Sequence, residues 1–181
     1  MDPDSWPIAS LLVLTIILSG LTSSIEMSFN ALNRVRIRNS AEDGDKRARR
    51  AILILSRFEE ALTTILIVNN VLSIASASLM TVLVTRLWGS GAVAWATIVL
   101  TVVFYIFAEM LPKTVARRRA DAIALNTSGV LLFLIRALKP FAFLFTKWGE
   151  MISRRFPAPA DPSFTEDELH EFAARLGMRR S

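Results

Sequence analysis

Polar side chains recur inside the apolar stretches of this chain at spacings that place them on common helical faces. In the first stretch they return every three or four positions, at Ser19, Ser23, Glu26, Asn30 and Asn33. In the second stretch the residues Asn69, Ser73 and Ser76 share one face, with Asn70 adjacent. Both spacings match the 3.6-residue period of an α-helix. An ionisable side chain inside an apolar stretch is costly, which makes Glu26 a functional candidate.

The third apolar stretch ends at Glu109, and Pro112 and Lys113 follow. Because Pro112 has no N–H, we expect the carbonyl of Ala108 to lose its helical donor. Carboxylate, carbonyl, amide and hydroxyl oxygens are hard ligands that suit Mg²⁺ or Ca²⁺, not Zn²⁺ or Cu. Interrupted helices that present carbonyls at membrane depth coordinate ions in transporters. These residues therefore predict a divalent-cation site inside a membrane.

Each part of this pattern also has a purely structural explanation. The serines could form a packing face with hydroxyls bonded to their own helix, and the adjacent asparagines could clasp two helices together. Glu109 could pair with Lys113, four residues later. Packing explains Glu26 poorly, since a carboxylate at depth needs a cation, a donor or water.

No residue constellation for catalysis or nucleotide binding is present, and we expect the protein not to be an enzyme. The chain has no Cys, and its single histidine, His170, lies in the polar tail. The phosphate-binding motifs G-x-x-x-x-G-K-[ST] and G-x-G-x-x-G do not occur in the sequence. A net charge of +5 would allow a nucleic-acid partner. The Lys and Arg residues cluster beside the apolar stretches, however, which is the usual signal of membrane topology. We therefore expect a lipid bilayer and no nucleic acid as partner.

The elements that must position these residues are membrane helices. The chain has 181 residues, of which 52% are hydrophobic, and a mean hydropathy of +0.43. Since about 20 apolar residues cross a bilayer, three spans are predicted, at about 6–33, 61–85 and 87–111. A signal peptide is the alternative for the first, but Asp2 and Asp4 precede it and no small-residue cleavage site follows. The predicted fold class is an all-α integral membrane protein.

The other segments up to residue 155 are predicted to be juxtamembrane helices. The uncharged stretch 122–135 is too short to cross comfortably. Aromatic and basic residues follow it, which favours amphipathic helices at 120–155 along the inner membrane surface. Segment 34–60 is charged but keeps an apolar stripe, and it predicts two short helices around a turn at 42–45.

The distribution of basic residues predicts the orientation of the chain. They gather in 34–57 and 113–119, whereas none precedes the first span. The positive-inside rule then places the N-terminus outside and the C-terminus in the cytosol, in a multi-pass protein of the inner (plasma) membrane. Residues 1–155 form the predicted transmembrane domain with its helical belt. A Pro-rich linker at 156–164 and the start of a cytosolic acidic helix at 165–181 follow, the latter opened by a capping box.

Four motifs, in order over about residues 8–155, resemble the signature of the CNNM/CorC family. Residues 23–34 resemble S-x-x-E-x-A-L-x-x-L-x-R, and residues 42–48 resemble E-x-G-D-x-x-A. Residues 63–70 resemble T-x-L-x-G-N-N, and residues 109–114 resemble E-x-x-P-K-[ST]. This family consists of Mg²⁺ transporters, whose bacterial members are known as hemolysin-like or magnesium/cobalt efflux proteins.

The resemblance implies a homodimer with three transmembrane helices per subunit and Na⁺-coupled Mg²⁺ export by alternating access. It implies an inward-facing Mg²⁺ site formed by Ser23, Asn69 and Glu109. We include the neighbouring Ser24, Asn70 and Ala108 as candidate metal ligands. The candidates for the ion pathway or coupling are Glu26, Ser28, Asn30, Ser73, Pro112 and Lys113. A Mg²⁺-sensing regulator of another transporter is the alternative function.

The chain departs from the family pattern in several places. Val68 stands where the family has Gly, and Ile25 and Met27 replace small or hydroxyl residues, which removes one oxygen ligand near Ser23. These 181 residues do not include the paired CBS domains of the family, so we expect the sequence to be a truncated form. We therefore expect no ATP binding in this chain.

Overall fold

The computed structural model describes residues 5–155, which form helices and short turns without strands. The all-α prediction is thus confirmed for these residues. The elements are α1 (Ser5–Ala31), α2 (Arg34–Glu42), α3 (Lys46–Leu55), α4 (Phe58–Trp88), the 3₁₀-helix η1 (Ser90–Ala92), α5 (Val93–Phe104), the π-helix η2 (Tyr105–Met110), α6 (Leu111–Arg118) and α7 (Ala120–Arg155). The predicted linker at 156–164 and acidic helix at 165–181 lie outside the described residues.

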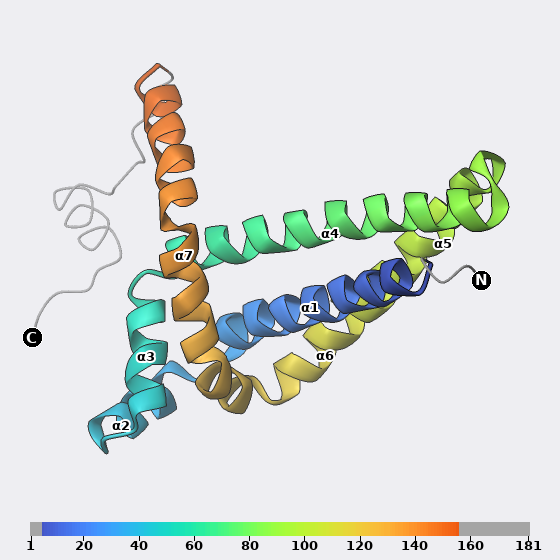
Figure 1. The fold of residues 1–181 in the computed structure, drawn as a ribbon. Coiled ribbons are helices and arrows are strands. Elements are labelled where there is room, and N and C mark those ends of the chain that lie inside the picture. The colour runs from blue at the N-terminus through green and yellow to red at the C-terminus, as the bar shows by residue number, and fades with distance from the viewer. Residues whose placement is uncertain (1–4, 156–181) are drawn as a thin grey trace, which may run out of the picture. The chain divides into compact units, whose positions relative to one another are not determined.

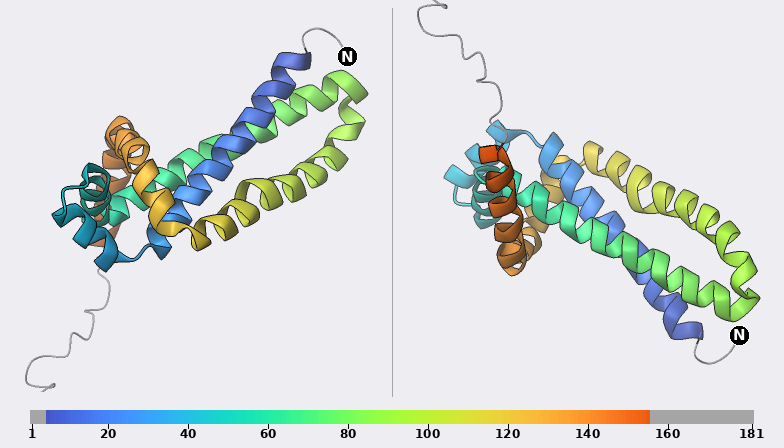
Figure 2. Two further views of the ribbon diagram at one scale, coloured as in Figure 1. Left: turned by 90° about the horizontal axis from the view of Figure 1, so that it is seen from below. Right: turned by 90° about the horizontal axis from the view of Figure 1, so that it is seen from above.

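The chain divides into two compact units, and the first comprises residues 1–142. Helix α1 is the central element of this first unit. It packs along α4 on one side and along η2 and α6 on another (Figures 1 and 2). Gly20 permits the second contact, because a Cβ there would lie only 3.2 Å from Cγ of Pro112 and 3.3 Å from the Phe107 carbonyl oxygen. Small residues allow this kind of close approach between membrane helices.

Four helical stretches are long and apolar enough to cross a membrane: Ser5–Ala31, Phe58–Trp88, Ser90–Arg118 and Ala120–Phe141. The first three correspond to the predicted spans, and the second and third continue into flanking charged residues. The fourth is longer than its uncharged part at 122–135, because the helix begins at Ala120 and continues past Arg136 to Phe141 and beyond. The count of three spans therefore stays a prediction.

The expectation of several amphipathic helices at 120–155 is wrong, because this segment is the single helix α7. Pro140 lies within it. A proline inside a helix removes the bond from its own position to the carbonyl four residues earlier, here Arg136, and the helix continues on both sides.

The expected break at Pro112 takes the form of a widened turn. Residues Tyr105–Met110 are π-helical, and the Leu111 N–H bonds to the Ile106 carbonyl, five residues earlier. Pro112 then falls in the first turn of α6, where a missing N–H costs little. Single π turns inside α-helices are frequent at functional sites.

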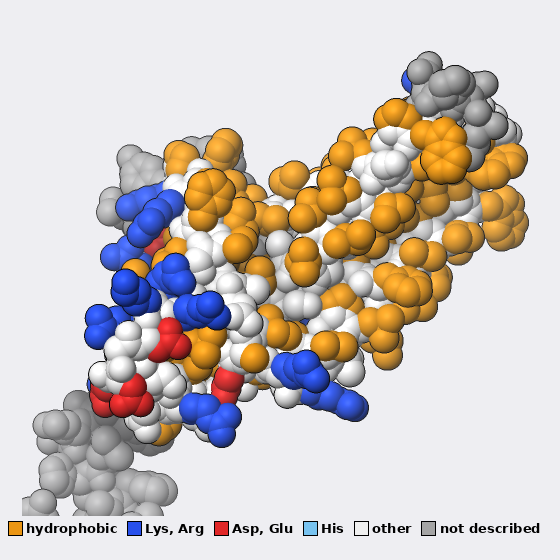
Figure 3. All heavy atoms as spheres, turned by 60° about the horizontal axis from the view of Figure 1, so that its bottom comes forward, with side chains coloured by type: hydrophobic (Ala, Val, Ile, Leu, Met, Phe, Trp, Pro, Cys, Tyr) orange, Lys and Arg blue, Asp and Glu red, His pale blue; other side chains and the backbone are white. Residues whose placement is uncertain are grey.

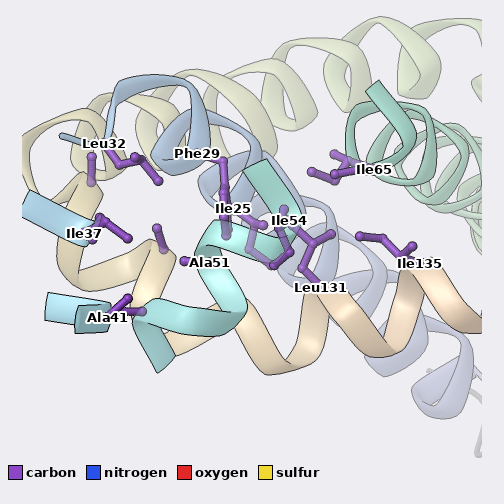
Figure 4. Close-up of a cluster of buried hydrophobic side chains, with 14 residues drawn as sticks. Ile25, Phe29, Leu32, Ile37, Ala41, Ala51, Ile54, Ile65, Leu131 and Ile135 are labelled. Atoms are coloured by element: carbon purple, nitrogen blue, oxygen red, sulfur yellow. The ribbon is translucent and has the colours of Figure 1, made fainter. Parts of the chain in front are cut away.

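Helices α2, α3 and the first half of α7 form one end of the first unit. Apolar side chains are buried together at this end, as Figure 4 shows. We call this cluster the basic-end core; its largest fully buried members include Phe29, Ile37, Ile54 and Leu131. The two helices predicted around the 42–45 turn are confirmed, with Gly44 at φ 100° between them. Lys and Arg side chains gather toward this end, whereas apolar side chains cover the long helices (Figure 3).

Candidate functional site

A cavity of about 260 Å³ lies between α1, α4 and the segment running from the end of α5 to α6. We call it the polar cavity. Its lining residues are Ser19, Ser23 and Glu26 from α1, Leu66, Asn69, Asn70 and Ser73 from α4, and Phe104, Ala108, Glu109 and Lys113 from the third stretch. Polar stripes from separate helices therefore converge in space, as their helical periodicity predicted.

Lys113 lies between two carboxylates in this cavity. Its Nζ is 3.0 Å from Oε1 of Glu109 and 3.6 Å from Oε2 of Glu26. The pairing of Glu109 with Lys113 within one helix, which we weighed as an alternative to a cation site, is therefore present. It extends to a second carboxylate on α1, a long-range contact that the spacing within the third stretch did not predict.

Neutral oxygens complete the polar lining. Asn69 presents its side-chain oxygen to the Thr22 hydroxyl of α1, which ties α4 to α1 beside the cavity. The Thr22 hydroxyl also lies 2.9 Å from the Ser19 carbonyl oxygen. The Leu18 carbonyl oxygen is a third acceptor, at 3.2 Å from the same hydroxyl. Since one hydroxyl carries one proton, the three acceptors share it. Ser23 and Ala108 are buried against the cavity.

The structure brings together eight of the residues predicted from sequence: Ser23, Glu26, Asn69, Asn70, Ser73, Ala108, Glu109 and Lys113. The other four predicted residues, Ser24, Ser28, Asn30 and Pro112, do not line this cavity. Ser24 donates to the Pro112 carbonyl oxygen at 3.4 Å, and buried Ser28 donates to the Ile25 carbonyl oxygen at 2.8 Å. Asn30 is exposed in the last turn of α1. Pro112 contributes to the contact with Gly20.

Three residues outside the predicted set also shape the site. Ser19 lies on the predicted polar face, one turn before Ser23, and lines the cavity. Thr22 lies three residues after Ser19 and four before Glu26, at the edge of the predicted polar face, so the helical spacing was a signal that could have included it. Gly20 carries no polar group, and its small size within an apolar run was the only signal of its close contact.

The donor set of the cavity fits a hard cation that keeps part of its water. Within residues 5–155, no group of three or more His, Asp or Glu side chains is arranged to hold a metal ion. A cation here would rest on two carboxylates, amide and hydroxyl oxygens, and water. Mg²⁺ usually binds through one or two carboxylates and retains several waters, so these residues suit it.

Comparison with known proteins identifies the chain's relatives. The family model "Cyclin M transmembrane N-terminal domain" (CNNM) matches residues 10–175. A UPF0053 protein of Haemophilus influenzae is 36% identical over 80% of this chain and 36% of its own length. The UPF0053 inner membrane protein YfjD of Escherichia coli is 32% identical over 90% of this chain and 40% of its own length.

A less similar relative has a name that states a function. The polyamine export protein of Haemophilus influenzae is 23% identical over 80% of this chain and 37% of its own length. The chain thus spans about two-fifths of the length of these curated relatives. Because the family model covers most of its residues, the chain belongs to the CNNM transmembrane-domain family.

Proposed function

We propose that this chain exports Mg²⁺ across the inner membrane through the polar cavity. One observation carries the proposal: Glu26 and Glu109, from different helices, converge on a single cationic group in an oxygen-lined cavity. Intramembrane ionisable residues mark ion pathways. Membership of the CNNM family supports the same activity.

In this mechanism the two carboxylates supply the charge that Mg²⁺ needs. Asn69, Ser23 and the Ala108 carbonyl supply neutral oxygens, directly or through retained water. The cation enters from the cytosolic side and leaves outward when α1 shifts against α4 and η2, the elements that enclose it. We include in the proposal a homodimer, an outside N-terminus, a cytosolic C-terminus and coupling to Na⁺.

Flux through the purified protein tests this function. The chain is reconstituted into liposomes that contain a Mg²⁺ indicator, and flux is followed with and without a Na⁺ gradient. Glu109→Gln removes one of the two carboxylates and is expected to abolish flux. Glu42→Gln is the matched control, because Glu42 is exposed at the end of α2, where it pairs with Arg38. Equal flux by wild type and Glu109→Gln would refute the proposal. Saturable binding without flux would instead support a Mg²⁺-sensing regulator.

A linear polyamine is the second candidate substrate. The Lys113 ammonium between two carboxylates already has the geometry of a bound alkylammonium group, and apolar Leu66 and Phe104 line the same cavity. The polyamine export relative provides independent support. Flux of a labelled linear diamine, measured in the same liposomes, decides between the substrates. Diamine transport without Mg²⁺ transport would favour the second candidate.

A further inference from the structure

We propose that Lys113 is a tethered counter-ion, which neutralises the carboxylates of the empty cavity and is displaced when a divalent cation binds. This inference rests on the proposed function and names the residue that determines which cation valence the cavity accepts. Under this inference, Lys113 competes with the transported cation for the two carboxylates. In a purely structural role, Lys113 would instead stay paired with Glu26 and Glu109 when the cation binds.

The geometry places the ammonium where a cation would bind. Nζ lies 3.0 Å from Glu109 and 3.6 Å from Glu26, and all three residues line the polar cavity. None of the three is fully enclosed, since their side chains are 32%, 47% and 31% exposed, respectively. Lys carries its charge on a flexible four-carbon stem. The ammonium can therefore leave the carboxylates while the backbone of α6 stays in place.

Charge arithmetic separates two states of the cavity. With Glu26, Glu109 and Lys113 all ionised, the cavity carries a net charge of −1. A divalent cation added beside Lys113 would raise this to +1, whereas the same cation replacing the ammonium gives zero. A monovalent cation gives zero with the ammonium still in place. Because an uncompensated charge inside a membrane protein is costly, divalent binding favours departure of Lys113.

The same arithmetic assigns Lys113 a part in the transport cycle. Without its ammonium, an empty cavity would hold two carboxylates and a net charge of −2, which disfavours any state that encloses it. Return of the empty protein should therefore depend on Lys113. Exchange of one bound Mg²⁺ for another does not pass through the empty state and should not depend on it.

Calorimetric titration of the whole chain with MgCl₂ provides the first test. Lys113→Met removes the competitor; if the ammonium occupies the site nine-tenths of the time, binding tightens about tenfold. Lys113→Arg keeps the charge but adds a guanidinium that grips carboxylates in pairs, so binding should weaken. Lys139→Met is the matched control, because Lys139 is exposed on α7. Tighter Mg²⁺ binding in Lys113→Met together with weaker binding in Lys113→Arg cannot arise from misfolding.

Reductive ¹³C-methylation provides a second test that observes the ammonium directly. The chain has few lysines, and Lys46, Lys139 and Lys147 are the others, so the methyl signal lost in Lys113→Met is assigned to Lys113. Addition of MgCl₂ should shift that signal and leave the other signals unmoved. In liposomes, Lys113→Met should lose net flux and retain Mg²⁺ exchange.

The outcomes distinguish this inference from the proposed function. If wild type binds Mg²⁺ but Lys113→Met binds with equal or weaker affinity, or if the Lys113 signal is insensitive to Mg²⁺, Lys113 is a structural partner and the inference is wrong while the transport proposal stands. If wild type neither binds nor transports Mg²⁺, the proposed function fails and this inference fails with it.

Discussion

The polar cavity and the basic-end core are both built on the second half of α1, yet they use its residues in opposite ways. Ser23 and Glu26 face the cavity, whereas Ile25 and Phe29 enter the core. Positions 100° apart on one helix thus serve two environments. The core consists of buried apolar side chains, to which α2, α3, α4 and α7 also contribute. The cavity keeps charged groups partly exposed.

This difference indicates that the basic-end core provides stability and that the polar cavity provides cation binding. Apolar burial in the core stabilises the arrangement of α1, α2, α3 and α7. The partly exposed charges in the cavity contribute little to stability, and the packed core and the α1–α4 contact hold the helices in place. Variants in the core should therefore change unfolding, and variants in the cavity should change cation binding. The following predictions test that separation, beginning with the largest expected effect.

Phe29→Ala should strongly destabilise the protein. Phe29 is 2% exposed in the basic-end core, and loss of a buried Phe side chain costs about 3–5 kcal/mol. Thermal unfolding in detergent measures the effect, with Phe133→Ala as the matched control because Phe133 is 68% exposed. A variant that unfolds like wild type would mean that the core does not hold this end together.

Glu26→Gln should weaken Mg²⁺ binding about a hundredfold, equivalent to roughly 2.7 kcal/mol. The reason is that Lys113 then neutralises the remaining carboxylate, Glu109, and leaves the cavity without net charge. The melting temperature should stay within about 2 °C of wild type, as for surface changes. Glu59→Gln, an exposed change at the start of α4, controls for loss of charge elsewhere. A large loss of stability in Glu26→Gln would break the proposed separation.

Gly20→Val should affect both properties, because it acts on the contact that encloses the cavity. Any Cβ at this position meets Pro112 and the Phe107 carbonyl, and overpacking of this kind costs about 1–3 kcal/mol. Separation of α1 from η2 and α6 would also move Glu26 away from Glu109 and Lys113. Gly91→Val is the control, since no atom lies within 4 Å of a Cβ there. Melting and titration should change together in Gly20→Val; unchanged binding would show that the close approach is not needed.

Thr22→Val should have the smallest effect, a weakening of Mg²⁺ binding by roughly fivefold, as expected for loss of about 1 kcal/mol from one hydrogen bond. The hydroxyl that holds the Asn69 side chain is lost while the side-chain volume is nearly kept. Thr97→Val is the matched control, because its exposed hydroxyl bonds only within its own helix in the described structure. Tighter binding would indicate that Thr22 withholds the Asn69 oxygen from the cation.

The polar residues that line the cavity could be predicted where the periodicity of a single helix places them on one face. Ser23, Glu26, Asn69 and Glu109 were predictable because each lies on a polar helical face or beside Pro112, and these are properties of a single segment. Their convergence in one cavity follows once the helices pack side by side.

Other features depend on contacts between segments, which a single sequence does not specify. Ser24 and Ser28 have suitable chemistry but face other surroundings, because the rotation of α1 is set by its neighbours. The bridge from Lys113 to Glu26 joins α6 to α1. The π turn before Pro112 and the continuity of α7 likewise reflect how the backbone adjusts around a proline, for which the sequence signal favours interruption.

The central claim, that the polar cavity binds the cation, is tested most directly by titrating wild type and Asn69→Ala with MgCl₂ in a calorimeter. Asn39→Ala, an exposed change on α2, serves as the control. We predict saturable binding in wild type and in Asn39→Ala, and its loss in a folded Asn69→Ala. Equal binding by all three proteins would contradict the account, because the cation would then bind outside the cavity that Asn69 lines.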